Sequence, residues 1–364
     1  MARLSDQDKL IANLEKEYGK GIIALGSDEA RLKIDRIPTG IFPLDFQTRG
    51  GIPAEQVTIL RGGEGGSKTT TAQIIVARYL DLCADCIVGC KCKKGAKKQR
   101  SVFWLNAEDK YPQETQDALG YDRDRIMIAG PETAEESIDM INDALYDPAV
   151  GLVVIDSVAA LCPKIEIEKS AEEQTVGVVA REINRMWRTI GAARRARKRK
   201  GRAPTVIVIN QERLKVGIMY GDPRTMTGGE GQKFNCALML RLGSRSMKDD
   251  KQRKDEPLIK VSVTVMKHNF GPKDLSCEYL LAMGKSGSLK FGEADDSEFL
   301  SATAGRFGLI KPDGSKWDIM GSNGKPLVTL PKVEAVQALL EERGDVYKKL
   351  KAAMMEKLKN GAAG

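Results

Sequence analysis

The sequence predicts an α/β protein built on a doubly wound, mostly parallel sheet, followed by a small α+β region. Three observations support this class. Short apolar, β-rich runs alternate with helical runs through the middle of the chain, as expected for parallel strands buried on both faces. A glycine-rich loop ending in Lys68-Thr69 joins one such run to a helix. Beyond about residue 287 the chain changes to short segments rich in Gly, Ser and Asp.

The expected elements follow in chain order. Residues 7–25 place apolar side chains on one helical face that ends near a Gly-Lys-Gly triplet. A helix is expected at 71–82, directly after the glycine-rich loop, and one charged helix at 333–359 ends the pattern. Strands are expected at 57–60, 101–106, 125–129, 152–156, 205–210, 237–242 and 259–268.

Composition narrows the class of protein. The 364 residues suffice for one large core with small appendages. Charged residues make up 30% and apolar residues 41%, which indicates a globular chain rather than a disordered or membrane protein. The first residues do not resemble a signal peptide, so we expect a cytoplasmic protein without a membrane partner. The formal net charge of +8 is compatible with an anionic partner.

The glycine-rich loop has the layout of a phosphate-binding P-loop. Its backbone N–H groups and the following helix N-terminus would face phosphate oxygens, with Lys68 on the β- and γ-phosphates and Thr69 on Mg²⁺. The usual glycine before the lysine is replaced by Ser67, which fits if its φ is negative. A flexible turn that happens to precede a lysine is the alternative. The candidate nucleotide-binding residues are Gly62, Gly63, Glu64, Gly65, Gly66, Ser67, Lys68, Thr69 and Thr70.

Two carboxylates follow apolar strands. Asp156 ends the run at 152–156, where it could hold Mg²⁺ through a water molecule or could simply cap a helix. Glu108 follows the strand at 101–106, where it could orient or deprotonate the water that attacks the γ-phosphate. The pairing of Asp156 with the upstream P-loop favours the nucleotide interpretation.

Several segments together match one family. Residues 14–21, 155–161 and 209–221, the last followed by Thr227-Gly228-Gly229, resemble the polymerisation helix, the Walker B strand and the second DNA-binding loop of a RecA-type recombinase. The resemblance covers nearly the whole chain, and its departures from the bacterial pattern favour a phage-encoded member. It implies a RecA-like P-loop ATPase core with an N-terminal oligomerisation helix and a small α+β C-terminal domain. The implied parts are 1–36 (polymerisation helix and linker), 37–288 (ATPase core) and 289–364 (C-terminal domain).

The resemblance also implies roles for single residues. Glu108, Lys68 and Gln211 would be catalytic, with Gln211 sensing the γ-phosphate, and Lys267 would reach ATP across a subunit interface. Thr69 and Asp156 would serve Mg²⁺. The first DNA loop corresponds to 166–177 and the second to 212–228. The implied DNA-binding residues are Val176, Arg181, Arg188, Arg213, Val216, Gly228 and Gly229.

The function implied is ATP-dependent DNA strand exchange in homologous recombination and repair. The chain would form a helical filament on single-stranded DNA, pair it with homologous duplex and hydrolyse ATP, assisted by single-strand-binding and loader proteins. Two alternatives stay open: a helicase or packaging motor on the same core, and a mediator that scarcely hydrolyses ATP. The mediator alternative rests on two departures from the bacterial pattern: Ser67 in the P-loop, and Asn269 in place of a second interface lysine.

Two features have no counterpart in the family pattern. The insertion at 83–100 carries Cys83, Cys86, Cys90 and Cys92, four thiols that could hold a structural Zn²⁺; an iron–sulfur cluster and unligated thiols are the alternatives. The run at 194–202 has seven basic residues in nine, which could help to capture duplex DNA or could be a solvated helix end.

Overall fold

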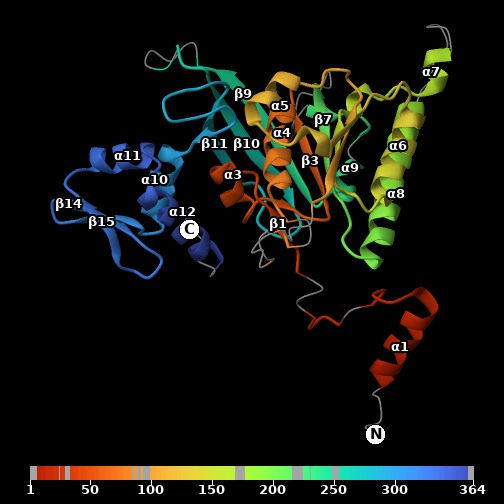
Figure 1. Cartoon of the computed structure of the whole chain (residues 1–364), viewed down its shortest axis with the longest axis horizontal. Coiled ribbons are helices and arrows are strands. Elements are labelled where there is room, and N and C mark those ends of the chain that lie inside the picture. Colours follow the sequence, from red (N-terminus) through yellow and green to blue (C-terminus); the bar gives the residue numbers. More distant parts are fainter. Residues whose placement is uncertain are drawn as a thin grey trace.

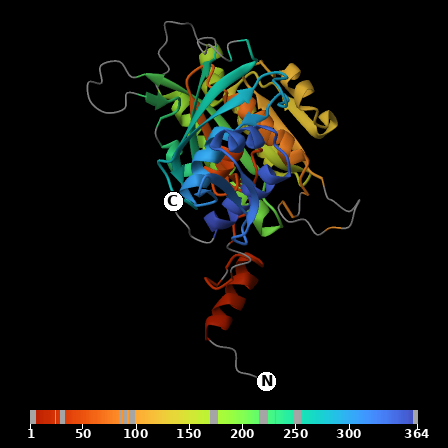
Figure 2. The same ribbon diagram turned by 90° about the vertical axis from the view of Figure 1, so that its left-hand side faces the viewer.

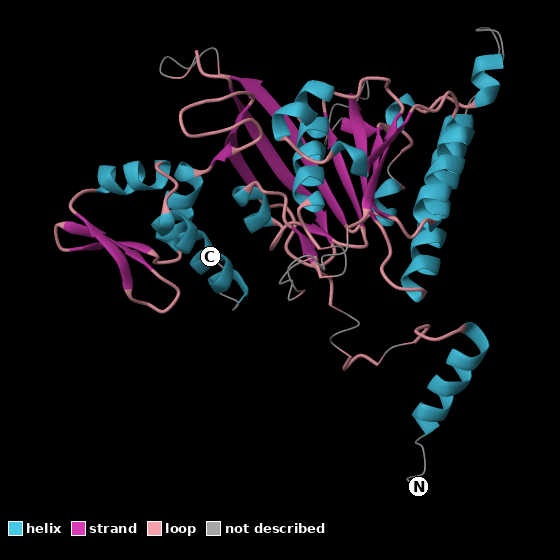
Figure 3. Ribbon diagram, viewed as in Figure 1, coloured by secondary structure: helices cyan, strands magenta, loops and turns pink. Residues whose placement is uncertain are grey.

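The structure is a computed structural model that describes residues 6–23, 25–28, 33–83, 86–87, 92, 99–168, 177–214, 224–229, 231–247, 253 and 255–359 (Figure 1). Its main body is a large sheet with helices on both faces (Figure 3). The strands of this sheet are β3 (Val57–Gly62), β4 (Ser101–Asn106), β5 (Ile126–Ala129), β6 (Val150–Asp156), β7 (Thr205–Leu214), β8 (Arg224–Met226), β9 (Leu238–Ser246), β10 (Leu258–His268), β11 (Ser276–Ala282) and β12 (Ala294–Asp295).

The strand order is β12-β11-β10-β9-β3-β7-β6-β4-β5, with β8 paired to β7. The pairs from β9 through β5 are parallel, whereas β9 to β12 pair antiparallel. This mostly parallel sheet confirms the predicted α/β class. A separate two-stranded sheet joins β1 (Arg36–Ile37) to β2 (Ile52–Pro53).

Helices cover both faces of the sheet, and their packing buries the apolar strands on both sides. One face carries α3 (Phe42–Gln47), α4 (Lys68–Leu80) and α5 (Gln113–Leu119), and the other carries α6 (Ala134–Tyr146) and α8 (Val178–Arg199). Successive side chains of a strand point to opposite faces, so Ile59 joins the α6–α8 core and Leu60 joins the α4 core. The short helices α7 (Lys164–Glu168) and α9 (Gln232–Asn235) lie in the connections.

The C-terminal part has its own core and its own three-stranded sheet. It consists of α10 (Ser297–Arg306), β13 (Ile310–Asp313), β14 (Lys316–Met320), β15 (Pro326–Leu330), α11 (Val333–Glu341) and α12 (Asp345–Lys359). Phe42 and Phe46 of α3 pack against Phe299, with ring centroids 6.3 and 5.8 Å away, and so join this core to the main body. The expected single helix over 333–359 is wrong, because the chain turns at Arg343, whose φ is +56°, before Gly344.

The N-terminal helix α1 (Asp6–Tyr18) lies apart from the sheet body and buries none of its residues (Figure 2). It ends at Tyr18, next to the Gly-Lys-Gly triplet, and Gly19 and Gly21 adopt positive φ there. Leu10 and Tyr18 are more than half exposed. Among the described helices, none is both long and apolar enough to cross a membrane.

Candidate ATP and DNA site

Four parallel strands bring the candidate catalytic residues to one edge of the sheet. In the strand register Gly62 lies opposite Gln211, and Asn106 lies opposite Asp156. The P-loop follows β3, and Glu108 follows β4 by two residues. The carboxyl edge of a parallel sheet is where ligands bind in this class of fold. The structure therefore gathers the P-loop, both carboxylates and Gln211 in one place.

The P-loop wraps tightly between β3 and α4. A Cβ on Gly62 would lie 2.1 Å from the carbonyl oxygen of Leu242, so a larger residue does not fit there. Lys68 begins α4 and donates a hydrogen bond from Nζ to the carbonyl oxygen of Gly63, 2.6 Å away. Burial lowers the pKa of Lys68, and the carboxylates of Glu108 and Asp156 oppose this shift. The ammonium is thus held inside the loop, close to where phosphates would sit.

Ser67 does not meet the condition that the sequence set for it. Its φ is +59° and its ψ is 23°, the left-handed conformation that glycine adopts freely and other residues rarely adopt. Its side chain makes no capping hydrogen bond to α4. The backbone of this P-loop therefore has the shape of a glycine-containing loop, with serine under strain at the position before Lys68.

We expect Ser67→Gly to stabilise the protein by about 1 kcal/mol, because glycine removes the left-handed strain while costing some entropy in the unfolded chain. Urea unfolding followed by circular dichroism would measure the change in the free energy of unfolding. Ser67→Ala is the matched control and should bring no gain, since alanine keeps a Cβ. Equal stability of the glycine and alanine variants would contradict the expectation.

Asp156 and Thr69 form the candidate magnesium site. The Thr69 hydroxyl donates to Oδ2 of Asp156 at 3.0 Å. Burial raises the pKa of Asp156 to about 6, the Thr69 hydrogen bond lowers it, and nearby Glu108 raises it again. A buried carboxylate beside a hydroxyl and a second carboxylate offers the hard oxygen donors that Mg²⁺ prefers. The residues present therefore fit a magnesium–nucleotide complex.

Glu108 is the centre of a hydrogen-bonded trio. Its Oε1 accepts from the Ser157 hydroxyl at 2.5 Å and from the Gln211 amide at 2.9 Å. Sequence reasoning missed Ser157, although a hydroxyl directly after the strand carboxylate Asp156 was a usable signal. The trio links the carboxylate expected to act on water with the residue that precedes the predicted second DNA loop.

The segment predicted to be the second DNA loop, 212–228, overlaps two strands, because β7 continues to Leu214 and pairs with β8. Asn210 fixes the C-terminal end of this segment. Its buried side-chain amide donates to the Thr227 carbonyl and to Oε1 of Gln232, both at 3.0 Å. Gln232, which sequence reasoning missed, also binds the Gly229 carbonyl at 3.2 Å. Gly228 has φ +82°, and a Cβ there would lie 2.6 Å from Ile183 of α8.

The other predicted DNA residues are spread along the same region. Arg181 and Arg188 are exposed on α8, away from its buried face, and Arg213 is exposed on β7. Val176 and Val216 lie outside the described residues, as do 169–176 and 215–223 of the two loops. Lys267 lies on β10, where Nζ donates to the carbonyls of Lys233 at 2.6 Å and Cys236 at 2.7 Å.

A buried ion pair that the sequence did not reveal joins the neighbouring strands β3 and β7 next to the P-loop and Gln211. Arg61 Nε of β3 is 2.5 Å from Glu212 Oε1 of β7, and the two side chains are 2% and 7% exposed. Arg61 directly precedes the P-loop glycines, and Glu212 directly follows Gln211. The pair therefore joins the strand that enters the P-loop to the strand that enters the predicted second DNA loop.

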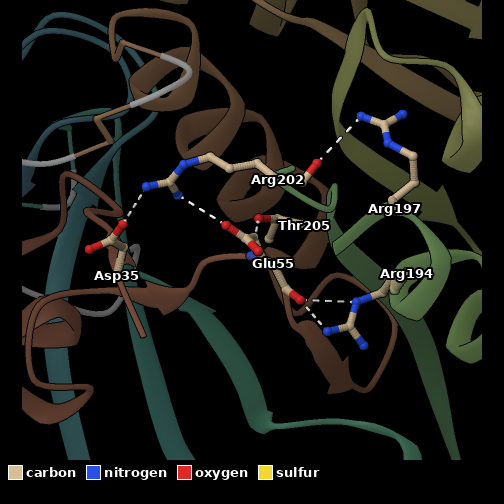
Figure 4. Close-up of polar contacts among 6 residues, drawn as sticks. All are labelled: Asp35, Glu55, Arg194, Arg197, Arg202 and Thr205. Carbon is tan, nitrogen blue, oxygen red and sulfur yellow. Dashed lines mark hydrogen bonds and ion pairs between the residues drawn. The ribbon is translucent and has the colours of Figure 1, made fainter. Parts of the chain in front are cut away.

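The basic run at 194–202 is only partly a charged surface (Figure 4). Arg194 Nε donates to the Glu55 carbonyl at 3.0 Å, and burial lowers the pKa of Arg194 to about 10. Arg202 binds Glu55 at 3.1 Å and Asp35 at 2.7 Å, while Arg197 is buried and reaches the Arg202 carbonyl at 3.4 Å. These three arginines therefore form neither a surface for duplex DNA nor a solvated helix end. The exposed remainder is Arg195, Lys198, Arg199 and Lys200.

Three of the four candidate zinc ligands lie close together beyond the end of α4. These are Cys83, Cys86 and Cys92, and their sulfur atoms are all within 4.8 Å of one another. Cys90 lies outside the described residues.

Comparison with known proteins identifies the family. The model of the RecA N-terminal domain matches residues 6–286. Proteins named Protein RecA are 29% identical in Trichormus variabilis and 30% in Nostoc punctiforme, each over 354 residues that cover 97% of this chain and 89% of the relative.

A Protein RecA of Symbiobacterium thermophilum is 33% identical over 289 residues, which cover 78% of this chain and 76% of the relative. A solved RadB recombinase shares 20% identity over 68% of this chain and 96% of its own, with a TM-score of 0.47, a likeness too weak to bear on function. Because the family model matches well over half of the chain, this protein belongs to the RecA family.

Proposed function

We propose that this chain is an ATP-dependent DNA strand-exchange protein that acts in homologous recombination and DNA repair. Family membership supports a role in recombination in general terms. The observation that carries the finer proposal is the hydrogen bond from Gln211 to Glu108, which connects the candidate hydrolytic carboxylate to the root of the second DNA loop. Through this hydrogen bond, a movement of Gln211 would change the position of Glu108, and the reverse.

Each residue at the sheet edge would have a separate role in ATP hydrolysis. Mg²⁺, when bound with ATP, neutralises charge on the phosphates. Lys68 and the N–H groups at the start of α4 would hold the phosphates, and Thr69 and Asp156 would hold the metal. Glu108 would orient the attacking water and accept its proton, while Ser157 and Gln211 fix the direction of its carboxylate.

Gln211 would convert nucleotide state into DNA affinity. Its amide nitrogen can bind either Glu108 or a phosphate oxygen, and the backbone that follows leads through Glu212 into the loop. A shift of that amide toward phosphate would reorder the loop, which is the way a bound γ-phosphate controls a switch segment. Lys267 would contribute to ATP binding across the interface after release from its present carbonyl partners.

DNA would be held through its phosphates and not read by sequence. Arg181, Arg188 and Arg213 supply exposed cations, and Gly228 and Gly229 bring backbone close to the strand. Val176 and Val216 would separate groups of bases. Base pairing between the bound strand and the incoming duplex would then supply specificity.

The assembly we propose is a helical filament on single-stranded DNA that captures duplex DNA, assisted by single-strand-binding and loader proteins. The exposed apolar residues of α1 suit a helix that packs on a neighbouring subunit. We propose the division into 1–36, 37–288 and 289–364, and a cytoplasmic location. Phage origin remains a prediction that the bacterial relatives do not support.

Joint-molecule formation tests the proposal. The assay contains a labelled oligonucleotide, a supercoiled duplex, Mg²⁺ and ATP, with a heterologous duplex as the control. We expect joints with the matching duplex only. DNA-stimulated hydrolysis without joints would favour a motor, and neither activity would favour a mediator.

Lys68→Ala should abolish DNA-stimulated ATP hydrolysis, with a loss of at least about 10²-fold, because the phosphates lose the buried ammonium that stabilises developing charge. A coupled phosphate-release assay with single-stranded DNA measures the rate. Lys311→Ala, on an exposed strand of the C-terminal sheet, is the control and should keep the wild-type rate. An unchanged rate in Lys68→Ala would remove the P-loop from the mechanism.

A further inference from the structure

The cysteine-rich insertion leaves and rejoins the main body at neighbouring points. Arg125, directly before β5, donates from Nη1 to the Leu80 carbonyl at 2.8 Å and from Nη2 to the Arg100 carbonyl at 2.9 Å. Leu80 is the last residue of α4, and Arg100 directly precedes β4. One guanidinium therefore holds both ends of the insertion in place.

Within this frame, part of the insertion is anchored in the core. Cys83 is 2% exposed, and Ile87 is 6% exposed and belongs to the same apolar core as α4. The backbone N–H of Ile87 donates to the Cys83 carbonyl at 2.8 Å, which closes a turn around Cys86. The sulfur atoms of Cys83, Cys86 and Cys92 lie within 4.8 Å of one another.

Two of the sulfur–sulfur distances are close to those of thiolates around one metal ion, and all three sulfur atoms lie within 4.8 Å of one another. Cys92 Sγ lies 3.9 Å from Cys83 Sγ and 3.5 Å from Cys86 Sγ. A disulfide would need about 2.05 Å. Sulfur atoms about 2.3 Å from a tetrahedral zinc ion lie about 3.8 Å from one another. The observed distances fall on either side of this value.

We propose that Cys83, Cys86 and Cys92 supply three of the four ligands of a structural Zn²⁺ that fastens the insertion to the C-terminal end of α4. Sulfur ligands select zinc over Mg²⁺, so this site is chemically distinct from the magnesium site at Thr69 and Asp156. The two sites lie at opposite ends of α4, because Lys68 begins the helix and Cys83 follows its end. A short polar segment cannot form a core of its own, and a bound metal ion supplies the stability that it lacks.

Metal analysis of the purified full-length protein tests the site directly. We expect close to one zinc per chain by mass spectrometry, and loss of that zinc in Cys83→Ser, Cys86→Ser and Cys92→Ser. Cys162→Ser is the matched control, because its thiol lies near Pro163 and outside the cluster, and it should keep the zinc. Replacement by Co²⁺ should give the visible bands of a tetrahedral thiolate site.

A second measurement on the wild type avoids variants that fail to fold. A strong chelator should release the zinc, expose three or more additional thiols to a thiol reagent, and lower the melting temperature by several degrees. ATP hydrolysis and joint formation are not part of this test, so its outcome is independent of the proposed function. Protein without metal, iron in place of zinc, or cysteine variants that keep full zinc content would overturn the proposal.

Discussion

Replacing Glu108 by glutamine should lower single-stranded-DNA-stimulated ATP hydrolysis by about 10²- to 10⁴-fold, the range typical of a lost general base. Glutamine keeps the size of the side chain and can still accept from Ser157 and Gln211, but it cannot take a proton from water. ATP binding should change little, because Lys68 and the P-loop are untouched. The rate is measured by phosphate release and the affinity by a fluorescent ATP analogue.

Glu114→Gln is the matched control for this prediction. Glu114 is an exposed carboxylate in the first turn of α5, on the same connection as Glu108 but outside the hydrogen-bonded trio. It should keep the wild-type rate. A Glu108→Gln rate within a few-fold of wild type would assign the proton transfer to another group and reduce Glu108 to a structural role.

The buried pair Arg61–Glu212 should give the largest effect on stability. Arg61→Met alone or Glu212→Leu alone leaves one uncompensated charge in the protein interior, which typically costs about 3–5 kcal/mol. The double variant removes both charges, and we expect it to recover most of that loss. Denaturant unfolding of the wild type, both single variants and the double variant gives the coupling energy as a double-mutant cycle.

An exposed ion pair provides the comparison. Asp345 and Lys349 lie 2.6 Å apart on α12, with side chains 76% and 58% exposed, and removing either should cost less than about 1 kcal/mol. Equal losses for the buried and exposed pairs would contradict the prediction. So would a double variant as unstable as the sum of the two single ones.

The elements that depend on local pattern could be predicted from the amino-acid sequence. The strand at Ser101–Asn106 has the predicted bounds, and the P-loop, Asp156 and the exit of α1 at Tyr18 lie where the motifs put them. Strands and glycine-containing turns depend on the backbone preferences of neighbouring residues, so the sequence pattern alone predicts them. The expected single helix over 333–359 was wrong because apolar periodicity resumed after the turn at Arg343.

The contacts between side chains that are distant in the sequence could not be predicted in this way. Gln211 and Glu108 are 103 residues apart, and Arg61 and Glu212 are 151 apart, yet strand register brings both pairs into contact. The basic run showed its charge in the sequence but not its half-buried partners Glu55 and Asp35. Contacts between distant segments follow from the packing of whole strands and helices, and the same packing holds Ser67 in a conformation that its own residue type disfavours.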